Sequence, residues 1–478
     1  MDPDINDYIA WIRHLSESSP RSTLFAGRCR RLASFLGDIT QNSTADEARL
    51  RQFIRVHYAS YGKDSILQET PADGFQVRPD RSNRLLFMAG YPSARQLAEI
   101  GAGYGIDPDF FDAHLSFMMD EIANLSVHPS HYTLPSSKHS ILQLSIQSVG
   151  SFMEGSGQLN WQRRRQQFSD EMGSYVHNLR MGRGWHVCDS IVRRIEIHDM
   201  HRFSLEQFVT VQISDSSDES TPWAVCLQVI IWSDAAADLK HGVQGPWTSV
   251  MNNIYFRPVT LHPWRICQYT GDGSSYGSDH SGEEVQQSAS LLGPAYEQLF
   301  RSADVPARPL DSLVVLFRYF CAAEAHYLDM VATVLEDSIP DSHAVPVARK
   351  RESIPDIRRI ILHSHRMLRR RRVHIIDILQ YLDWHSAAVS ESASGDVSTG
   401  KLLKTDLEHL LLSNADLMSR CQHDLDSMTS EATFEDAERG ITLSKSSRKF
   451  TAFAAIYVPL AFTSSVFGMN FIQIDNNT

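Results

Sequence analysis

The clearest hydrophobic periodicity lies near the end of the chain. From about residue 401, apolar positions alternate at spacings of four and three residues, the a/d pattern of a helix that packs against other helices. Because neighbouring helices are what bury such a seam, we expect this helix to have helical partners. One polar residue, an asparagine, falls inside the pattern. The seam positions are Leu407, Leu411, Asn414, Met418, Cys421, Leu425, Met428 and Ala432.

An uncharged block follows this helix directly. Residues 450–467, FTAFAAIYVPLAFTSSVF, contain no charged side chain. At 1.5 Å per residue a helix of this length measures about 27 Å, close to the thickness of a bilayer's hydrocarbon core. The pattern predicts a stalk helix over residues 401–449 and a transmembrane helix over residues 450–468. The alternative interpretation is a buried core helix.

The charges that flank this block predict its orientation. Lys445, Arg448 and Lys449 precede it, whereas Asp475 is the one charged residue that follows. Cationic side chains stay on the cytoplasmic side of a membrane span. We therefore expect a membrane protein with the bulk of the chain in the cytoplasm. Its C-terminal segment, residues 469–478, would face outward as a loop.

Strand patterns occur in the first half of the chain. Runs of β-branched and aromatic residues predict strands at 84–90, 191–197, 203–213 and 224–232. Between the first two runs, Ser93 and the Asp107–Pro108 pair are typical starts of helices. These elements favour an α+β fold class with an α/β/α cytosolic domain.

Helical patterns flank this strand-rich part. The predicted organisation is a helix-rich region over residues 1–83, the cytosolic domain over 84–300, a long helical pair over 308–386, and then the stalk and the span.

Composition and charge exclude several classes of protein. The 478 residues include 45 basic and 57 acidic side chains, a net charge of −12. A general nucleic-acid binder needs a positive face, so no nucleic-acid partner is expected. The six cysteines are scattered without a Cys-x-x-Cys pair, which favours reduced thiols in a cytosolic compartment.

The C-terminal sequence resembles a known family. KFTAFAAIYVPLAFTSSVFGMNF is similar to the first transmembrane helix of the CorA-type divalent-cation channels, ending on the Gly-Met-Asn signature at Gly468, Met469 and Asn470. Upstream, residues 90–117 (GYPSARQLAEIGAGYGIDPDFFDAHLSF) resemble a cytosolic helix of the fungal-type branch with its Gly-Ile-x-Pro element. The match covers roughly residues 84–472.

This resemblance implies a homo-oligomer, a pentamer, that conducts Mg²⁺ or another divalent cation passively. The signature residues would form the ion entrance, where the amide oxygen of Asn470 meets the hydrated ion. The inward stripe of the span would be pore-lining, or alternatively a small-residue face for helix packing. Its positions are Ala454, Val458, Ala461 and Ser465.

The family's second transmembrane helix does not follow Asn470 in this sequence. Two interpretations remain open: a truncated sequence, or a degenerate member of the family that does not conduct. A third hypothesis comes from another class of function. One C-terminal span with a coiled-coil stem also suits a tail-anchored tethering protein.

Other motifs carry weaker signals, and no catalytic residue, enzyme activity or bound cofactor is predicted. The Gly-x-Ser-x-Gly match at 273–277 lies in a Gly/Ser/Asp-rich linker, where a nucleophile elbow does not form. Two His-x-x-His pairs, at 128–131 and 198–201, lack further patterned zinc ligands. Two arginine runs, 163–165 and 369–372, are interpreted as solvated faces or as anchors on anionic headgroups.

Overall fold

The computed structural model describes most of the chain as helices around one sheet. The described residues are 5–18, 23–37, 54–59, 67–68, 83–119, 140–152, 161–181, 184–213, 229–236, 239, 243, 245–247, 254–256, 287–301, 312–338, 354–389 and 397–475. The helices are α1 (Ile5–Ser18), α2 (Thr23–Gly37), α4 (Ala94–Tyr104), α5 (Pro108–Met119), α6 (Trp161–Arg180), the 3-10 helix η4 (Ser288–Leu291), α7 (Leu292–Arg301), α9 (Val314–Ser338), α10 (Ile354–Val389) and α11 (Val397–Asp475).

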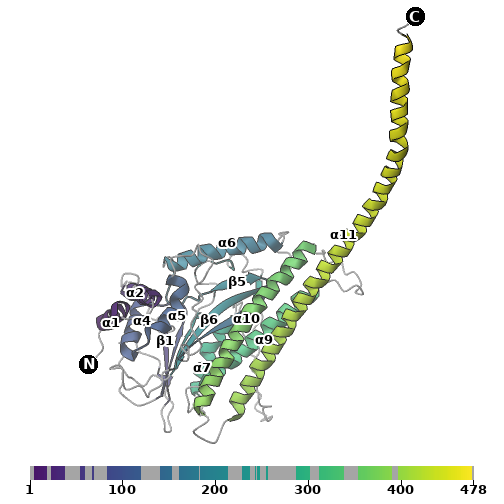
Figure 1. The fold of residues 1–478 in the computed structure, drawn as a ribbon. Helices are drawn as coiled ribbons and strands as arrows, with labels where there is room; N and C mark the ends of the chain where they lie inside the picture. Colours follow the sequence, from purple (N-terminus) through teal and green to yellow (C-terminus); the bar gives the residue numbers. More distant parts are fainter. Residues whose placement is uncertain are drawn as a thin grey trace.

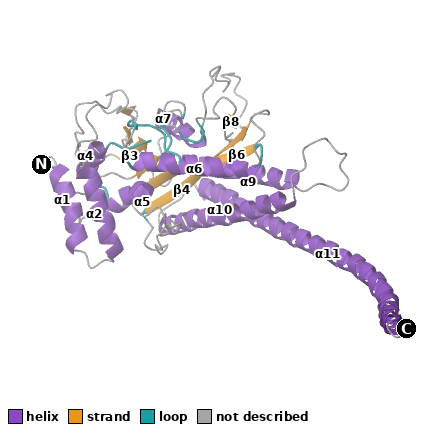
Figure 2. Ribbon diagram, turned by 90° about the horizontal axis from the view of Figure 1, so that it is seen from above, coloured by secondary structure: helices purple, strands orange, loops and turns teal. Residues whose placement is uncertain are grey.

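The strands form a single mixed sheet in the order β2-β1-β3-β7-β6-β4-β8, with β5 paired to β6. Strands β3 and β7 pair in parallel, and the other described pairs are antiparallel. Figure 2 shows the sheet among the helices. The strands are β1 (Ile54–Ala59), β2 (Leu67–Gln68), β3 (Asn83–Ala89), β4 (Ile141–Phe152), β5 (Arg194–Ile197), β6 (Arg202–Ile213), β7 (Val229–Ser233) and β8 (Ile254–Phe256).

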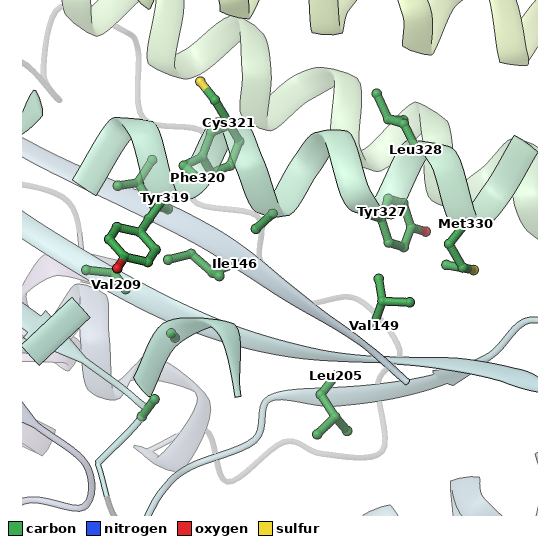
Figure 3. Packing of buried hydrophobic residues seen from close by; sticks show 14 of the residues in the cluster. Ile146, Val149, Leu205, Val209, Tyr319, Phe320, Cys321, Tyr327, Leu328 and Met330 are labelled. Carbon is green, nitrogen blue, oxygen red and sulfur yellow. The ribbon is translucent and has the colours of Figure 1, made fainter. Parts of the chain in front are cut away.

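Strand β3 separates two hydrophobic clusters. Successive side chains of a strand point to opposite faces of its sheet. Accordingly, Leu85 and Phe87 join a cluster with α7, α9, α10 and α11, whereas Leu86 and Met88 join a second one with α1, α2, α4 and α5. Figure 3 shows part of the larger cluster, where side chains of α9 lie over β4 and β6. The sheet therefore carries helices on both faces.

The helix start signals read from the sequence are confirmed at α4 and α5. The Ser93 side chain accepts a hydrogen bond from the Gln96 amide at the N-terminus of α4, and Gly105 ends that helix with φ of 62°. The Asp107 carboxylate accepts from the Asp109 amide where α5 begins. These short-range interactions form wherever the right residue meets the right position, which is why the sequence predicted them.

The sheet differs from the predicted one in several places. Strand β1 pairs with β3, so the sheet begins before residue 84, inside the region expected to be mainly helical. The twelve-residue strand β4 was not predicted, although it pairs along most of β6. The predicted strand at 191–197 begins only at Arg194, as β5. The predicted strand at 224–232 is confirmed from Val229 onward, and residues 224–228 lie outside the described residues.

The long helix α11 buries its seam within this chain. Leu407 and Cys421 are fully buried, and Leu411, Leu425 and Met428 pack against the cluster that includes α9 and α10. The predicted seam is thus confirmed as far as Met428. The expected helical partners of this stretch are α9 and α10 of the same chain. Ala432 is exposed.

Beyond Met428, α11 leaves the domain as one continuous curved helix (Figure 1). Pro459 lies inside it and Gly440 lies in its exposed part. The helix has no break at the expected boundary between stalk and span, and it begins at Val397 rather than at residue 401. It also continues to Asp475, so most of the predicted outward loop, 469–478, is helical.

Replacing Leu407 by alanine tests the intrachain packing of α11. Leu407 is fully buried, so Leu407→Ala should lower the free energy of unfolding by about 2–5 kcal/mol through lost burial and a cavity. The matched control is Leu412→Ala, since Leu412 is 70% exposed on the same helix. Chemical unfolding of the detergent-solubilised chain measures both. Equal effects of the two changes would contradict the packing described.

Candidate functional site

The uncharged C-terminal part of α11 is long and apolar enough to cross a membrane. None of its most apolar window is buried against the rest of the chain. Phe450, Tyr457 and Phe467 are each more than 60% exposed, and their neighbours are similarly open. The alternative of a buried core helix therefore does not hold within this chain. Such a large exposed apolar surface marks contact with a membrane or with other proteins.

The four predicted pore-lining residues share one face of this helix. Ala454, Val458, Ala461 and Ser465 follow spacings of four, three and four, and all four are exposed. The signature residues Gly468, Met469 and Asn470 belong to the backbone of α11, while their side chains lie outside the described residues.

A buried ion cluster fixes the helices that support α11. Arg371 of α10 is 1% exposed, and its Nε donates to Glu324 Oε2 of α9 at 2.9 Å. Its Nη1 donates to Ser145 Oγ of β4 at 2.6 Å, and its Nη2 donates to the Ser145 carbonyl at 2.7 Å. Ser145 in turn donates to Glu206 Oε1 of β6 at 2.5 Å. One guanidinium therefore joins two helices to two strands.

Electrostatics keeps Glu206 of this cluster ionised. Burial acts to raise the pKa of Glu206, but Arg194, Arg371 and the hydrogen bond from Ser145 outweigh it and hold the pKa below its usual value. The pKa of Arg371 is raised, because Glu324 and Glu206 more than offset its burial. Glu206 and Arg371 are therefore both charged at neutral pH.

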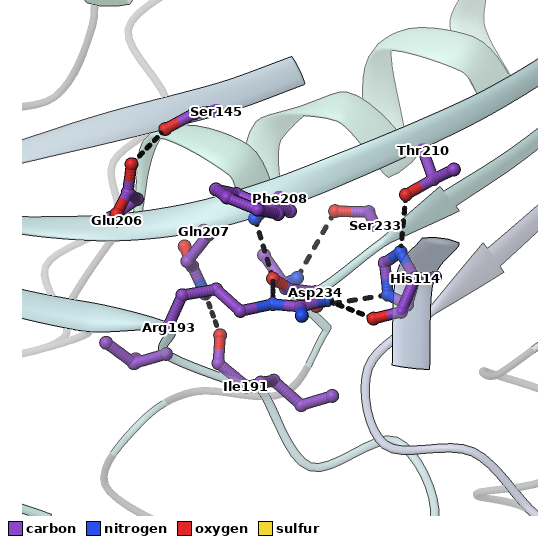
Figure 4. A network of polar contacts seen from close by, with 12 residues as sticks. His114, Ser145, Ile191, Arg193, Glu206, Gln207, Phe208, Thr210, Ser233 and Asp234 are labelled. Carbon is purple, nitrogen blue, oxygen red and sulfur yellow. Dashed lines mark hydrogen bonds and ion pairs between the residues drawn. The ribbon is translucent and has the colours of Figure 1, made fainter. Parts of the chain in front are cut away.

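A second buried network surrounds Asp234 at the end of β7 (Figure 4). Arg193 contacts both carboxylate oxygens, with Nε at 2.6 Å and Nη2 at 2.9 Å. The Phe208 amide donates to Asp234 Oδ2 at 2.6 Å. His114 Nε2 lies 3.0 Å from Oδ1, and its Nδ1 lies 2.8 Å from Thr210 Oγ1. Burial raises the pKa of Asp234, but Arg193 and His114 reverse that effect and lower it.

The order Thr210–His114–Asp234 resembles the hydroxyl, imidazole and carboxylate of a nucleophilic triad. All three side chains are fully buried. Burial lowers the pKa of His114 to about 4, with Arg193 adding to the effect and Asp234 opposing it. A nucleophile must reach its substrate, and this hydroxyl does not reach the surface. The network therefore holds α5 against β6 and β7 rather than performing chemistry.

The histidine pairs do not form a metal site in the described part of the chain. His198 is fully buried beside Ser204 Oγ at 2.9 Å, whereas His201 is exposed, so the two rings do not converge. The pair at 128–131 lies outside the described residues. Among the described residues, no group of three or more histidine, cysteine or acidic side chains could hold a metal ion.

The arginine runs are only partly solvated. Arg163 and Arg369 are exposed, but Arg164 is 5% exposed and Arg371 is 1% exposed. Arg164 Nη1 donates to the Met200 carbonyl at 2.8 Å, and its guanidinium lies 4.6 Å from the centre of the Phe152 ring. The interpretation as solvated faces was wrong for these two positions, because a run of arginines on a helix must turn one member toward the core.

The comparisons with known proteins assign neither a family nor a function to the chain. No protein-family model matches the chain, and no curated protein matches it either.

Removing Arg371 tests the ion cluster. Arg371→Met would leave the buried Glu324 without its counter-ion and would remove one of the two arginines that face Glu206, so we expect a loss of about 3–5 kcal/mol in the free energy of unfolding. Arg372→Met is the control, since Arg372 is the exposed neighbour and should change stability by less than about 0.5 kcal/mol. Chemical unfolding at neutral pH measures both. Similar losses in the two variants would contradict the stabilising role of Arg371 in the buried cluster.

The buried histidine His198 should make the fold sensitive to acid. Burial, together with Arg165 and Arg202, lowers the pKa of His198 to about 3. Below about pH 6.5 the unfolded chain therefore binds a proton that the folded chain does not, so stability falls as pH falls.

His198→Gln should remove about one linked proton from the slope of unfolding free energy against pH between about pH 6 and 4. His201→Gln, which changes the exposed member of the pair, is the control variant. Urea unfolding at a series of pH values measures the slope. An unaltered slope in His198→Gln would contradict a neutral, buried His198.

Proposed function

We propose that this chain is a subunit of a CorA-like divalent-cation channel that conducts Mg²⁺ passively. The observation that supports this most is the continuity of α11. A single helix runs from its packed seam in the domain, through an exposed apolar segment of membrane length, to the Gly-Met-Asn positions. This order of parts is the one that the resemblance of the sequence implies.

The proposal assigns the sheet and its helices to an α/β/α cytosolic domain and the exposed part of α11 to a stalk. Two clusters on opposite faces of β3 are consistent with three layers. Lys445, Arg448 and Lys449 precede the apolar segment, which favours a cytoplasmic position for the domain. The C-terminal residues would then face the outer side.

Ion selection would occur at Asn470 in a ring of five copies. Mg²⁺ gives up its water shell reluctantly, so neutral amide and carbonyl oxygens suit the hydrated ion. Gly468 has no side chain and would let neighbouring backbones approach at a crowded axis. No covalent chemistry is needed, because the membrane potential drives the ion inward.

The stripe on α11 would form the narrow part of the pore. The side chains of Ala454, Val458 and Ala461 are small and apolar, and a ring of such groups excludes water from a constriction. Ser465, one turn closer to the signature, would offer a hydroxyl to an entering ion. Gating would then consist of wetting and drying this constriction.

A tail-anchored tethering protein is the second candidate function. It is favoured by the packing of α11, since the seam as far as Met428 is covered by helices of the same chain. Within the described residues, α11 is also the one helix that is apolar enough to cross a membrane. A tether needs this anchor and a surface on the domain, but it needs no pore.

Mg²⁺ entry into vesicles distinguishes the two functions. The purified full chain is reconstituted into vesicles that contain a Mg²⁺-sensitive dye, and a potential that is negative inside is applied. We expect Mg²⁺ entry in the unaltered chain and a reduction of about tenfold or more in Asn470→Ala, because the entrance loses its amide oxygens. Asn476→Ala is the matched control and should conduct normally.

The failures of this experiment are distinguishable. No Mg²⁺ entry through a chain that resists carbonate extraction would favour the tether. Normal Mg²⁺ entry in Asn470→Ala would contradict the proposed role of Asn470 at the ion entrance. Release of the chain from membranes by carbonate alone would contradict both functions.

A further inference from the structure

A pocket of about 350 Å³ lies between α6 and α10. None of its lining residues belongs to the apolar segment of α11, the Arg371 cluster or the Asp234 network. Four of its lining residues lie on α6 between Gln162 and Ser169, at spacings of three, one and three. Four more lie on α10 between Arg359 and Arg366, at the same spacings. These spacings place each set on one face of its helix, so two facing helical stripes form the walls. Trp161 adds its ring where α6 begins.

The pocket has more positive than negative charge. Arg165, Arg359 and Arg366 line it, whereas no acidic residue does. Arg359 lies 3.4 Å from the carboxylate of Asp356, which also accepts a hydrogen bond from Gln162. Among the described residues, Arg165 and Arg366 have no carboxylate within ion-pair distance. Neither guanidinium therefore forms a close ion pair among the described residues, although the charge of Arg165 also acts on Glu196 nearby.

Arg165 is held in place beside the pocket. Its Nη2 donates to His363 Nδ1 at 2.9 Å, and its guanidinium lies 5.5 Å from the centre of the Trp161 ring. His363 is buried and uncharged, because burial and then His198, Arg165 and Arg366 lower its pKa to about 2. Its 3.6 Å contact with Glu196 is therefore not an ion pair, and the histidine does not neutralise the carboxylate or add charge.

Two buried polar atoms of the lining residues also lack a hydrogen-bond partner among the described residues. They are Trp161 Nε1 and His363 Nε2, on side chains that are 3% and 4% exposed. Both atoms are enclosed by protein, and His363 Nε2 lies 3.6 Å from Glu196 Oε2, so neither is a contact for a molecule in the pocket.

We propose that the α6–α10 pocket binds a small phosphate-bearing anion, with Arg165 and Arg366 as its principal cationic contacts. A guanidinium binds phosphate oxygens through paired N–H donors, and two such groups match a doubly charged phosphate. The volume lies within the range of about 300–1,000 Å³ that is usual for small-molecule sites. This site goes beyond the proposed function and does not rest on it.

The position of the pocket favours a free phosphate compound over a lipid headgroup. α11 last packs against the domain at Met428, and the uncharged block begins 22 residues later at Phe450. This stretch of helix measures about 33 Å. Headgroups around the block would therefore lie far from a pocket inside the domain.

Pyrophosphate titration tests the site. The detergent-solubilised full chain is titrated with inorganic pyrophosphate in a calorimeter at moderate salt. Arg366→Gln should weaken binding about tenfold, which is the expected effect of losing one charged contact. Arg369→Gln is the matched control, since Arg366 and Arg369 are both exposed on the same helix but Arg369 does not line the pocket.

A second pair of variants covers the other wall. Arg165→Gln should weaken binding to a similar extent, and Arg163→Gln, an exposed neighbour on α6, should not. Circular dichroism confirms that each variant is folded.

Three results would overturn the proposal. One is a failure of the unaltered chain to bind pyrophosphate at millimolar concentration. Another is an equal loss of binding in Arg366→Gln and Arg369→Gln, which would indicate general charge attraction only. The third is binding to vesicles that contain phosphatidic acid without binding to free pyrophosphate, which would assign the site to a lipid surface.

Discussion

The buried guanidinium of Arg371 determines how the helical and sheet parts of this protein fit together. It contacts α9 through Glu324 and the sheet through Ser145, and Glu206 of β6 completes the cluster. Three residues earlier on α10, the Leu368 carbonyl accepts a hydrogen bond from Asn414 of α11. A buried charge without its partner is costly, so this cluster tolerates one arrangement of the four elements. The direction in which α11 leaves the domain follows from that arrangement.

Much of the fold could be predicted from local patterns. The seam of α11 from Leu407 to Met428, the capping residue Ser93 and the start of α5 at Pro108 depend on neighbours within a few turns. Strand β4 was not recognised, although Leu142, Leu144 and Ile146 alternate with polar residues. This alternation is the pattern of a half-exposed strand. In the structure, however, Ser145 and Gln147 are buried, and Ser145 accepts a hydrogen bond from Arg371 of α10.

The candidate sites also differ in how far they could be predicted from local sequence patterns. The apolar segment and the Gly-Met-Asn positions are contiguous in sequence, so they could be recognised there. The α6–α10 pocket joins residues nearly 200 positions apart, such as Arg165 and His363. The arginine runs did signal unusual charge, yet one run contains both exposed Arg369 and buried Arg371. A sequence pattern could not separate these roles, because the contact that buries Arg371 comes from other elements.

The unsupported part of α11 between Met428 and Phe450 acts mechanically as a lever arm. A tilt of the domain by about 5° would displace the far end of a 33 Å rod sideways by about 3 Å. Gly440 is the weakest point of this rod, because glycine stabilises a helix less than any other residue except proline. Motion of the domain would therefore reach the apolar segment either as a rigid swing or as a bend centred near that glycine.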